Sequence, residues 1–318
     1  MAEPGENLQA EPLHISAALE VEQLDVNLFR SKSLWLPIRA RGVFGGQVIS
    51  QALVSATKCV KPEYSLHSLH CYFLLSASPA VPILYHVDRV RDGRSYATRA
   101  VRAIQNGKTV FILLCSFQRP EPWQPSYHVP MPEGVPPPEE CEDVEAAYHR
   151  LSQSPEVDPG IRAYAAEYVQ ERKKSPFEIK NAKIETSNGS KTIMYWFRIR
   201  NMEKYEPSFQ KCILSYISDS HFIGSAARTI GLHALKQGTD RLSMLSTLDH
   251  SIFFYDNDFD CGEWLLYVIN SPRIRSGRGV VHGRMYTHTG VLVAVMTQEG
   301  VVRADIRDPS TSGEKAKL

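Results

Sequence analysis

The stretch YSLHSLHCYF, residues 64–73, returns in altered form as STLDHSIFFY, residues 246–255. Both stretches carry His-Ser followed by apolar and aromatic residues, and about 180 residues separate them. A Gly-Arg pair follows each motif at nearly the same spacing. Arg94 lies 27 residues after His67, and Arg278 lies 28 residues after His250. A shared motif at a shared spacing indicates a duplicated unit. The chain is therefore predicted to hold two copies of one structure.

A helical segment precedes each copy of the motif. The segment GGQVISQALVSATK, residues 45–58, places apolar side chains at helical spacing directly after Gly45-Gly46. The segment CILSYISDSHFIGSAARTIG, residues 212–231, does the same and ends at Gly231, so one long helix is expected there. Each copy is thus expected to have an initial strand and then one long, largely apolar helix before the motif.

Strands follow the motif in both copies. Asn106-Gly107 is a hairpin signal, because a type I′ turn requires positive φ at both central residues, and Thr289-Gly290 holds the matching place. The runs 109–117 and 291–297 are nearly all apolar, which predicts strands covered on both faces. A sheet wrapped round a buried helix accounts for this order of elements. The predicted class is α+β, a double hotdog with two tandem units, each an antiparallel sheet wrapped round a long helix.

A proline-rich stretch, RPEPWQPSYHVPMPEGVPPPEE, separates the two copies and can form neither a ladder nor a helix interior. Two short helices with one charged side each are expected after it. The predicted organisation is a flexible N-terminal tail (1–18), a first hotdog unit (19–118), a linker with short helices (119–175), a second hotdog unit (176–308) and a C-terminal tail (309–318).

Composition excludes several classes of protein. Lys and Arg number 36 against 35 Asp and Glu, so the chain has no bulk charge for nucleic acid or an anionic membrane. Six scattered cysteines form neither a CxxC pair nor a zinc-type cluster, which favours reduced intracellular thiols. No apolar run approaches the roughly 18 residues of a spanning helix. Serine-hydrolase, phosphate-loop and zinc-protease motifs are missing, and no metal or cofactor is predicted.

Polar groups suited to water activation occur in the second copy. Asp219 falls on the apolar side of the expected helix, where a buried carboxylate is costly unless it is paired, hydrogen-bonded or protonated. The alternative is a capping role for Asp219 at a helix that starts at Ser220. Gln298 ends an apolar strand, and Thr247 stands three residues before the second motif histidine. The first copy has Tyr64 and about Ser116 at the places of Thr247 and Gln298, and its helix lacks a carboxylate, so one active centre per pair of units is expected.

Six stretches in order identify a family: FGGQVISQAL, HSLHCYF, RDGRSYATRAVRAIQNGK, YISDSHF, TLDHSIFF and TQEGVVR. Together they resemble the acyl-CoA thioesterase II family from about residue 19 to 303, and the resemblance implies the double hotdog. Its catalytic trio falls on Asp219, Thr247 and Gln298. The family usually continues its second motif as His-Ser-Met-Trp-Phe-His, whereas this chain has HSIFFY, which puts the shape of the acyl pocket in doubt.

The resemblance implies hydrolysis of medium to long fatty acyl-CoA by an activated water, and self-association. The alternatives are a non-catalytic acyl-CoA binding protein and a hotdog acyl-CoA hydratase or dehydratase. For substrate binding, Gly45 and Gly46 are candidates for close backbone approach, and His67 is a candidate with a competing structural role. Arginine suits the phosphates of coenzyme A. A local basic stretch holds Arg273, Arg275, Arg278 and Arg284, and at least one of these arginines is a candidate to contact them, with a solvated loop as the alternative.

The chain ends in Ala316-Lys317-Leu318, which differs by one small residue from the Ser-Lys-Leu signal of peroxisomal import. An accidental tripeptide is the competing explanation, because a motif of three residues has a high false-positive rate. The expected location is the peroxisome matrix, reached through the peroxisomal import receptor. Neither a nucleic-acid partner nor membrane insertion is expected.

Overall fold

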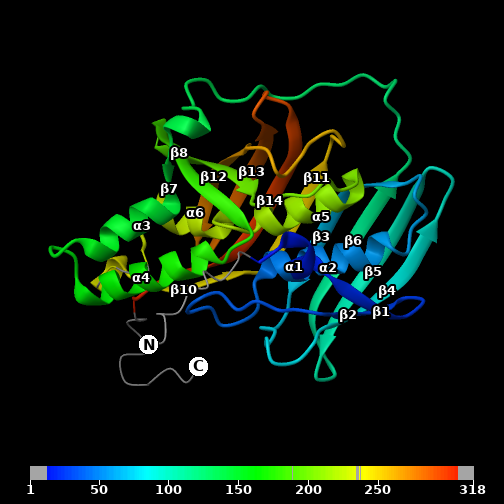
Figure 1. The fold of residues 1–318 in the computed structure, drawn as a ribbon, viewed down its shortest axis with the longest axis horizontal. Helices are drawn as coiled ribbons and strands as arrows, with labels where there is room; N and C mark the ends of the chain where they lie inside the picture. The colour runs from blue at the N-terminus through cyan, green and yellow to red at the C-terminus, as the bar shows by residue number, and fades with distance from the viewer. Residues whose placement is uncertain (1–12, 188, 234–235, 237, 307–318) are drawn as a thin grey trace, which may run out of the picture.

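The computed structural model describes residues 13–187, 189–233, 236 and 238–306 (Figure 1). One 14-stranded sheet forms the backbone of the molecule, in the order β1-β2-β4-β5-β6-β3-β11-β14-β13-β12-β9-β8-β7, with β10 paired to β14. Neighbouring strands are antiparallel, as expected for strands that follow one another through hairpins. Each half of this sheet repeats the same strand pattern, so the double hotdog is confirmed.

The first unit holds the strands β1 (Val21–Asp25), β2 (Leu28–Ser31), β3 (Ser65–Phe73), β4 (Leu84–Asp92), β5 (Tyr96–Gln105) and β6 (Lys108–Gln118), with helices α1 (Ile15–Leu19) and α2 (Gly45–Thr57). The second unit holds β8 (Phe177–Ser187), β9 (Ser190–Ile199), β10 (Leu242–Thr247), β11 (Asp249–Phe254), β12 (Leu265–Arg275), β13 (Arg278–Thr287) and β14 (Leu292–Ala304), with α5 (Pro207–Ser218), α6 (Phe222–Thr229) and the 3-10 turn η2 (Gly238–Asp240).

The two repeated motifs join the units. They form β3 and β11, which pair antiparallel at the centre of the sheet, with Cys71 opposite His250 and Leu69 opposite Ile252. The helices α2 and α5 lie side by side against the sheet (Figure 1), and the Ser50 hydroxyl on α2 donates to the Cys212 carbonyl on α5 over 2.8 Å. Residues 46–56 of α2 are all buried, which explains the apolar composition of this helix.

The expectation of a single helix over 212–231 is wrong. The chain leaves α5 at Ser218 and enters α6 at Phe222, and between them His221 adopts φ 60°, a left-handed conformation that no helix interior accepts. Asp219 therefore follows α5 as its C-cap residue. The capping alternative is also wrong, since the residue that precedes α6 is His221. Local propensity favoured one helix, and packing of each piece against the sheet divides it.

Turn geometry explains the hairpins. Asn106 and Gly107 have φ of 51° and 73°, so the predicted type I′ turn between β5 and β6 is confirmed. The hairpin predicted at Thr289-Gly290 joins β13 to β14, but its turn is not of type I′, because only Gly290 has positive φ there. In the second unit Ser276 and Gly277, with φ of 53° and 72°, make the two-residue turn between β12 and β13.

The connection between the units contains η1 (Pro138–Glu140), β7 (Glu142–Asp143), α3 (Val144–Gln153) and α4 (Pro159–Lys173). Its proline-rich part runs as a long loop over the top of the molecule in Figure 1. Helices α3 and α4 pack on each other through Tyr148 and Tyr168, whose ring centroids lie 4.3 Å apart. The N-terminal tail is shorter than expected, because α1 already begins at Ile15 and buries Ile15 and Ala18.

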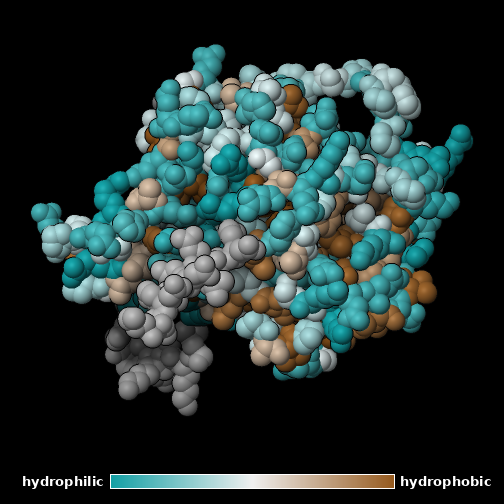
Figure 2. Space-filling model, viewed as in Figure 1, coloured by the Kyte–Doolittle hydropathy of each residue, from teal (hydrophilic) through white to brown (hydrophobic). Residues whose placement is uncertain are grey.

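Coverage of the sheet differs from expectation in the first unit. Ile112 and Leu114 on β6 are 38% and 48% exposed, so this strand is covered on one face only. Several hydrophobic patches reach the surface in Figure 2, mostly at the lower right over the first unit. All six cysteines are buried and none forms a disulfide. Among the described residues, no helix has the length and apolar character that a membrane crossing requires.

Candidate active site

Asp219 faces the helix of the other unit. Its position at the end of α5 brings its carboxylate to the first turn of α2, where the backbone N–H of Gly46 lies close enough to lower the pKa of the carboxyl. Gly45 is equally close, because a Cβ placed on this residue would lie 2.6 Å from Asp219 Oδ2. The N-terminal end of a helix favours negative charge, so α2 stabilises the ionised carboxylate. Both units therefore contribute to the site.

Gln298 and Thr247 complete the surroundings of the carboxylate. Gln298 is fully buried on β14, and its Nε2 donates to Asp219 Oδ1 over 2.6 Å. Thr247 ends β10, which pairs with β14, and its hydroxyl lies close enough to Asp219 to lower the pKa of the carboxyl. The structure thus brings together the three residues that the comparison of the two halves selected, from a helix end and two adjacent strands.

The protonation of Asp219 depends on two opposed effects. Burial raises the pKa of this carboxyl, because a protein interior disfavours the charged form. Hydrogen bonds from Gln298, Gly46 and Thr247 oppose burial, but the pKa of Asp219 stays above its ordinary value. A carboxylate with a raised pKa is a stronger proton acceptor than a solvated one. This is the property that a general base requires.

One polar atom at the site lacks a partner. Gln298 Oε1 is buried and accepts no hydrogen bond from the described residues. Buried amide oxygens are nearly always paired, so this atom is an acceptor available to a water molecule or a substrate group. Together with the carboxylate it offers two acceptors, which match the two hydrogens of a water molecule.

Two residues at the site were missed by the sequence analysis. His250 on β11 is fully buried, and its Nδ1 lies 3.0 Å from Gln298 Nε2. Its Nε2 lies 3.1 Å from the hydroxyl of Ser218, the residue before Asp219. The repeated His-Ser motif was the signal for His250, but the register that places it beside Gln298 cannot be obtained from the motif alone.

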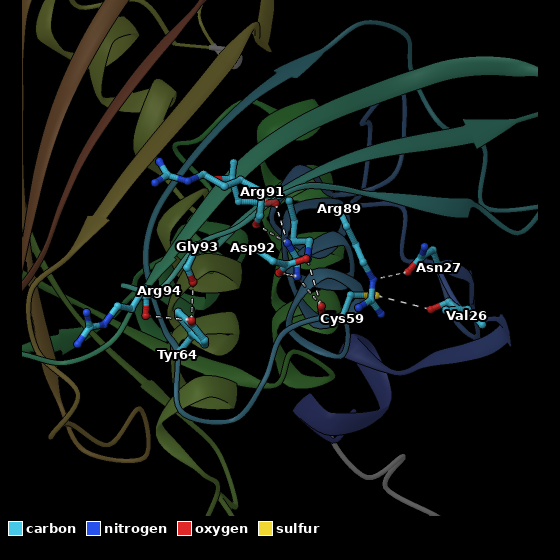
Figure 3. Close-up of polar contacts among 11 residues, drawn as sticks. Val26, Asn27, Cys59, Tyr64, Arg89, Arg91, Asp92, Gly93 and Arg94 are labelled. Carbon is cyan, nitrogen blue, oxygen red and sulfur yellow. Dashed lines mark hydrogen bonds and ion pairs between the residues drawn. The ribbon is translucent and has the colours of Figure 1, made fainter. Parts of the chain in front are cut away.

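The first unit does not reproduce this site. Tyr64, at the place of Thr247, donates its hydroxyl to the carbonyl of Gly93 over 2.7 Å (Figure 3). His67 is half-buried, and its Nε2 lies 2.8 Å from Ser116 Oγ. On β3 the residue opposite His250 is Cys71, four residues from His67. The structure therefore does not bring His67 to Asp219. Its contact with Ser116 supports the structural role.

The arginines proposed for phosphate binding lie on the face of the sheet opposite the carboxylate site. In the β13–β14 register Val281 pairs with the buried Gln298, so both side chains lie on the inner face of the sheet. Arg278 is three residues from Val281 on the same strand. Because side chains alternate between the two faces of a strand, Arg278 projects from the outer face. Arg273 and Arg275 share this outer face, because they pair with Val280 and Arg278. Arg278 is exposed and forms an ion pair with Glu299 at 3.1 Å. These three side chains do not line the carboxylate site.

Arg284 lies six residues from Arg278 on the same strand, about 20 Å away along a fully extended chain. It therefore does not belong to the same cluster. Two surface clefts lie elsewhere in the second unit, one beside Arg198 and Arg200 and the other beside Pro207 and Asn257. Neither cleft is lined by Asp219.

Comparison with known proteins agrees with the fold. Residues 33–118 match the model of the acyl-CoA thioesterase N-terminal domain, and residues 138–302 match that of the C-terminal domain. Acyl-coenzyme A thioesterase 8 of Rattus norvegicus is 37% identical over 302 residues, which cover 92% of this chain and 90% of that protein. The peroxisomal acyl-coenzyme A thioester hydrolase 1 of Saccharomyces cerevisiae is 23% identical over 337 residues and covers 91% of this chain and 94% of its own.

A solved structure shows the same fold. The acyl-CoA thioesterase II TesB2 of Mycobacterium marinum superposes with a TM-score of 0.72 at 31% identity, covering 95% of this chain and 99% of its own. Tandem hotdog units with a carboxylate held between them define a thioester hydrolase of the double-hotdog class. Within that class, the chain belongs to the acyl-CoA thioesterase family.

Proposed function

We propose that this thioesterase hydrolyses fatty acyl-CoA to free fatty acid and coenzyme A, with Asp219 as the general base. Thr247 and Gln298 hold the attacking water and the carboxylate in a fixed arrangement. The observation that carries the proposal is the hydrogen bond from Gln298 Nε2 to the buried Asp219 carboxylate, next to the unpaired Gln298 Oε1, with Gly46 of the first unit and Thr247 close enough to lower the pKa of Asp219.

The water is activated by position and by proton transfer. It donates one hydrogen to the Asp219 carboxylate and the other to Gln298 Oε1, which directs an oxygen lone pair at the thioester carbon. As the new C–O bond forms, Asp219 takes the proton, and fixed orientation supplies most of the acceleration. The tetrahedral intermediate then expels coenzyme A as a thiolate, which takes the electron pair of the C–S bond. Because the pKa of a thiol is about 8.5, this leaving group needs no strong acid. The proton returns from Asp219 to the thiolate or to solvent.

The oxyanion is stabilised at the start of α2. The Gly46 N–H already serves Asp219, so the N–H of Gly45 is the donor assigned to the developing charge. Glycine is required here because the carboxylate approaches the helix within the space of a methyl group. The helix end adds its own partial positive charge.

Release of thiol from decanoyl-CoA, followed with a thiol reagent, tests this function. Thiol release with fatty acid as the second product supports hydrolysis. Binding of decanoyl-CoA without thiol release supports a non-catalytic binding protein. A change in acyl unsaturation without thiol release supports a hydratase or dehydratase. A series of substrates from octanoyl-CoA to palmitoyl-CoA then tests the proposed broad range of medium to long acyl chains.

For location we propose the peroxisome, which rests on the resemblance to a thioesterase named as peroxisomal in yeast. The import signal Ala316-Lys317-Leu318 lies outside the described residues. A fluorescent protein fused to the N-terminus of the full chain should colocalise with peroxisomes and become diffuse when Leu318 is deleted. Punctate signal after that deletion would show that another segment directs import. Self-association is tested by light scattering of the purified chain, where a monomer mass would reject it.

A further inference from the structure

We infer that His250 is a positioning residue that fixes the orientation of the Gln298 amide, through a chain of hydrogen bonds that ends at Ser218. The inference rests on the proposed roles of Asp219 and Gln298 in water activation. It assigns to the buried histidine of the second motif a function in the reaction without contact to substrate.

The chain of hydrogen bonds starts on α5. Ser218 carries one hydroxyl proton, and its Oγ donates to the carbonyl of Ser215 over 2.9 Å. The same oxygen lies 3.1 Å from His250 Nε2, and having given its proton away it can only accept there. The proton of the neutral imidazole must therefore be on Nε2. This fixes the tautomer of His250.

The tautomer in turn fixes the amide. With its proton on Nε2, His250 presents a bare lone pair at Nδ1, 3.0 Å from Gln298 Nε2. The amide nitrogen has two hydrogens, and it gives one to His250 and the other to Asp219 Oδ1. A flipped amide would put its oxygen against both the carboxylate and the Nδ1 lone pair. The correct orientation leaves Oε1 directed away from both and unpaired, as the water site requires.

Burial prevents His250 from taking another role. The imidazole is fully buried, with the ring of Phe222 at a centroid distance of 5.5 Å. Burial lowers the pKa of His250 to about 3, so the ring stays neutral throughout the working range of pH. A neutral ring whose Nδ1 already accepts from Gln298 is not available as a base. Its effect on the reaction must pass through Gln298.

Other titratable groups around the site do not change this. Cys71 on β3 and Tyr267 on β12 face Asp219, and burial raises the pKa of both well above their ordinary values. With His250 titrating near 3, none of these three groups changes charge between about pH 5 and 8. The pKa of Asp249, which precedes His250 and accepts from the Glu299 N–H, is also raised by burial, so the acid limb of the rate profile is assigned to Asp219 with Asp249→Asn as the control.

The first test reads the tautomer directly and needs no turnover. In protein labelled with 15N-histidine, the chemical shifts of the two ring nitrogens identify the protonated one, and the His250 signals are those that disappear in His250→Asn. The expected result is a neutral ring with its proton on Nε2 from pH 5 to 8. A proton on Nδ1, or a charged ring in this range, would overturn the inference.

The second test uses two serines of α5. Ser218→Ala removes the acceptor of His250 Nε2, whereas the matched control Ser215→Ala removes a hydroxyl that donates only to the Lys211 carbonyl within the helix. With decanoyl-CoA, Ser218→Ala should lower kcat about tenfold with KM within about twofold, as expected for one orienting hydrogen bond. Its acid limb should move to higher pH, because a misplaced amide no longer stabilises the Asp219 carboxylate. Ser215→Ala should keep the kcat and acid limb of the wild type.

An acid limb in Ser218→Ala at the wild-type position would overturn the inference, whatever happens to kcat, because a structural defect lowers the rate without moving the limb. Equal losses in both variants would do the same. The proposed function fails by a different result, namely an Asp219→Asn variant that keeps its activity. The tautomer of His250 is measured without turnover, so that measurement tests the inference even if the proposed function fails.

Discussion

Gly45→Ala should remove activity while the fold survives. The added Cβ would lie 2.6 Å from Asp219 Oδ2 and 3.0 Å from Phe73 Cζ, whereas ordinary van der Waals contact begins at 3.4 Å. The carboxylate oxygen must therefore retreat by about 0.8 Å, more than the spread of roughly 0.5 Å that hydrogen-bond lengths tolerate. At least one donor to Asp219 is lost, and a displacement approaching 1 Å in a reacting group costs about a hundredfold in rate.

The matched control is Gly224→Ala in α6. This glycine is also helical, but its added Cβ would have only Leu245 Cδ2 within 4 Å, at 3.9 Å. Thiol release from decanoyl-CoA measures kcat, and differential scanning fluorimetry measures Tm. We expect kcat of Gly45→Ala to fall about a hundredfold with binding of coenzyme A retained, and Gly224→Ala to keep the wild-type kcat with an equal or higher Tm. A kcat for Gly45→Ala within twofold of wild type would refute the placement of the carboxylate against α2.

Three further predictions follow from the same geometry. Asp219→Asn should raise Tm at pH 8, because burial disfavours the charged form of the wild-type side chain. The difference in Tm from wild type should shrink as the pH falls through the raised pKa of Asp219, because both side chains are then neutral. A difference in Tm that does not depend on pH would contradict the burial effect. Thr247→Val should lower kcat about tenfold, and Thr247→Ser, which keeps the hydroxyl, should keep most of the rate; equal rates in the two variants would exclude a role for the hydroxyl. Arg278→Ala should leave KM for decanoyl-CoA unchanged, because this side chain lies on the outer face of the sheet, and a rise in KM above fivefold would restore it as a phosphate ligand.

Much of the fold could be predicted from the sequence because the duplication leaves a strong signal. Two copies of one motif, each after an apolar helix, define the units, and the pairing of β3 with β11 is what the repeat produces. The break at His221 could not be predicted, since a left-handed residue inside an apolar helical pattern depends on tertiary packing. The exposure of Ile112 and Leu114 could not be predicted either, because an apolar run in the sequence does not show which face of a strand is covered.

The site shows the same division. Asp219, Thr247 and Gln298 could be selected because their chemistry differs from that of the corresponding residues in the first unit. His250 and Ser218 could not, because a histidine present in both copies looks structural until its register beside Gln298 is known. The arginines were chosen for their charge, but the face on which a strand residue lies depends on the register, which a one-residue shift reverses.

A single-turnover measurement tests water activation by Asp219 most directly. Enzyme in excess is mixed with radiolabelled decanoyl-CoA, the reaction is quenched at successive times, and free coenzyme A and free decanoate are measured in the same samples. If Asp219 acts as a base on water, coenzyme A and decanoate appear together at one rate. Release of coenzyme A ahead of decanoate, with label retained on the peptide that contains Asp219, would show that the carboxylate itself attacks the thioester and would contradict the account.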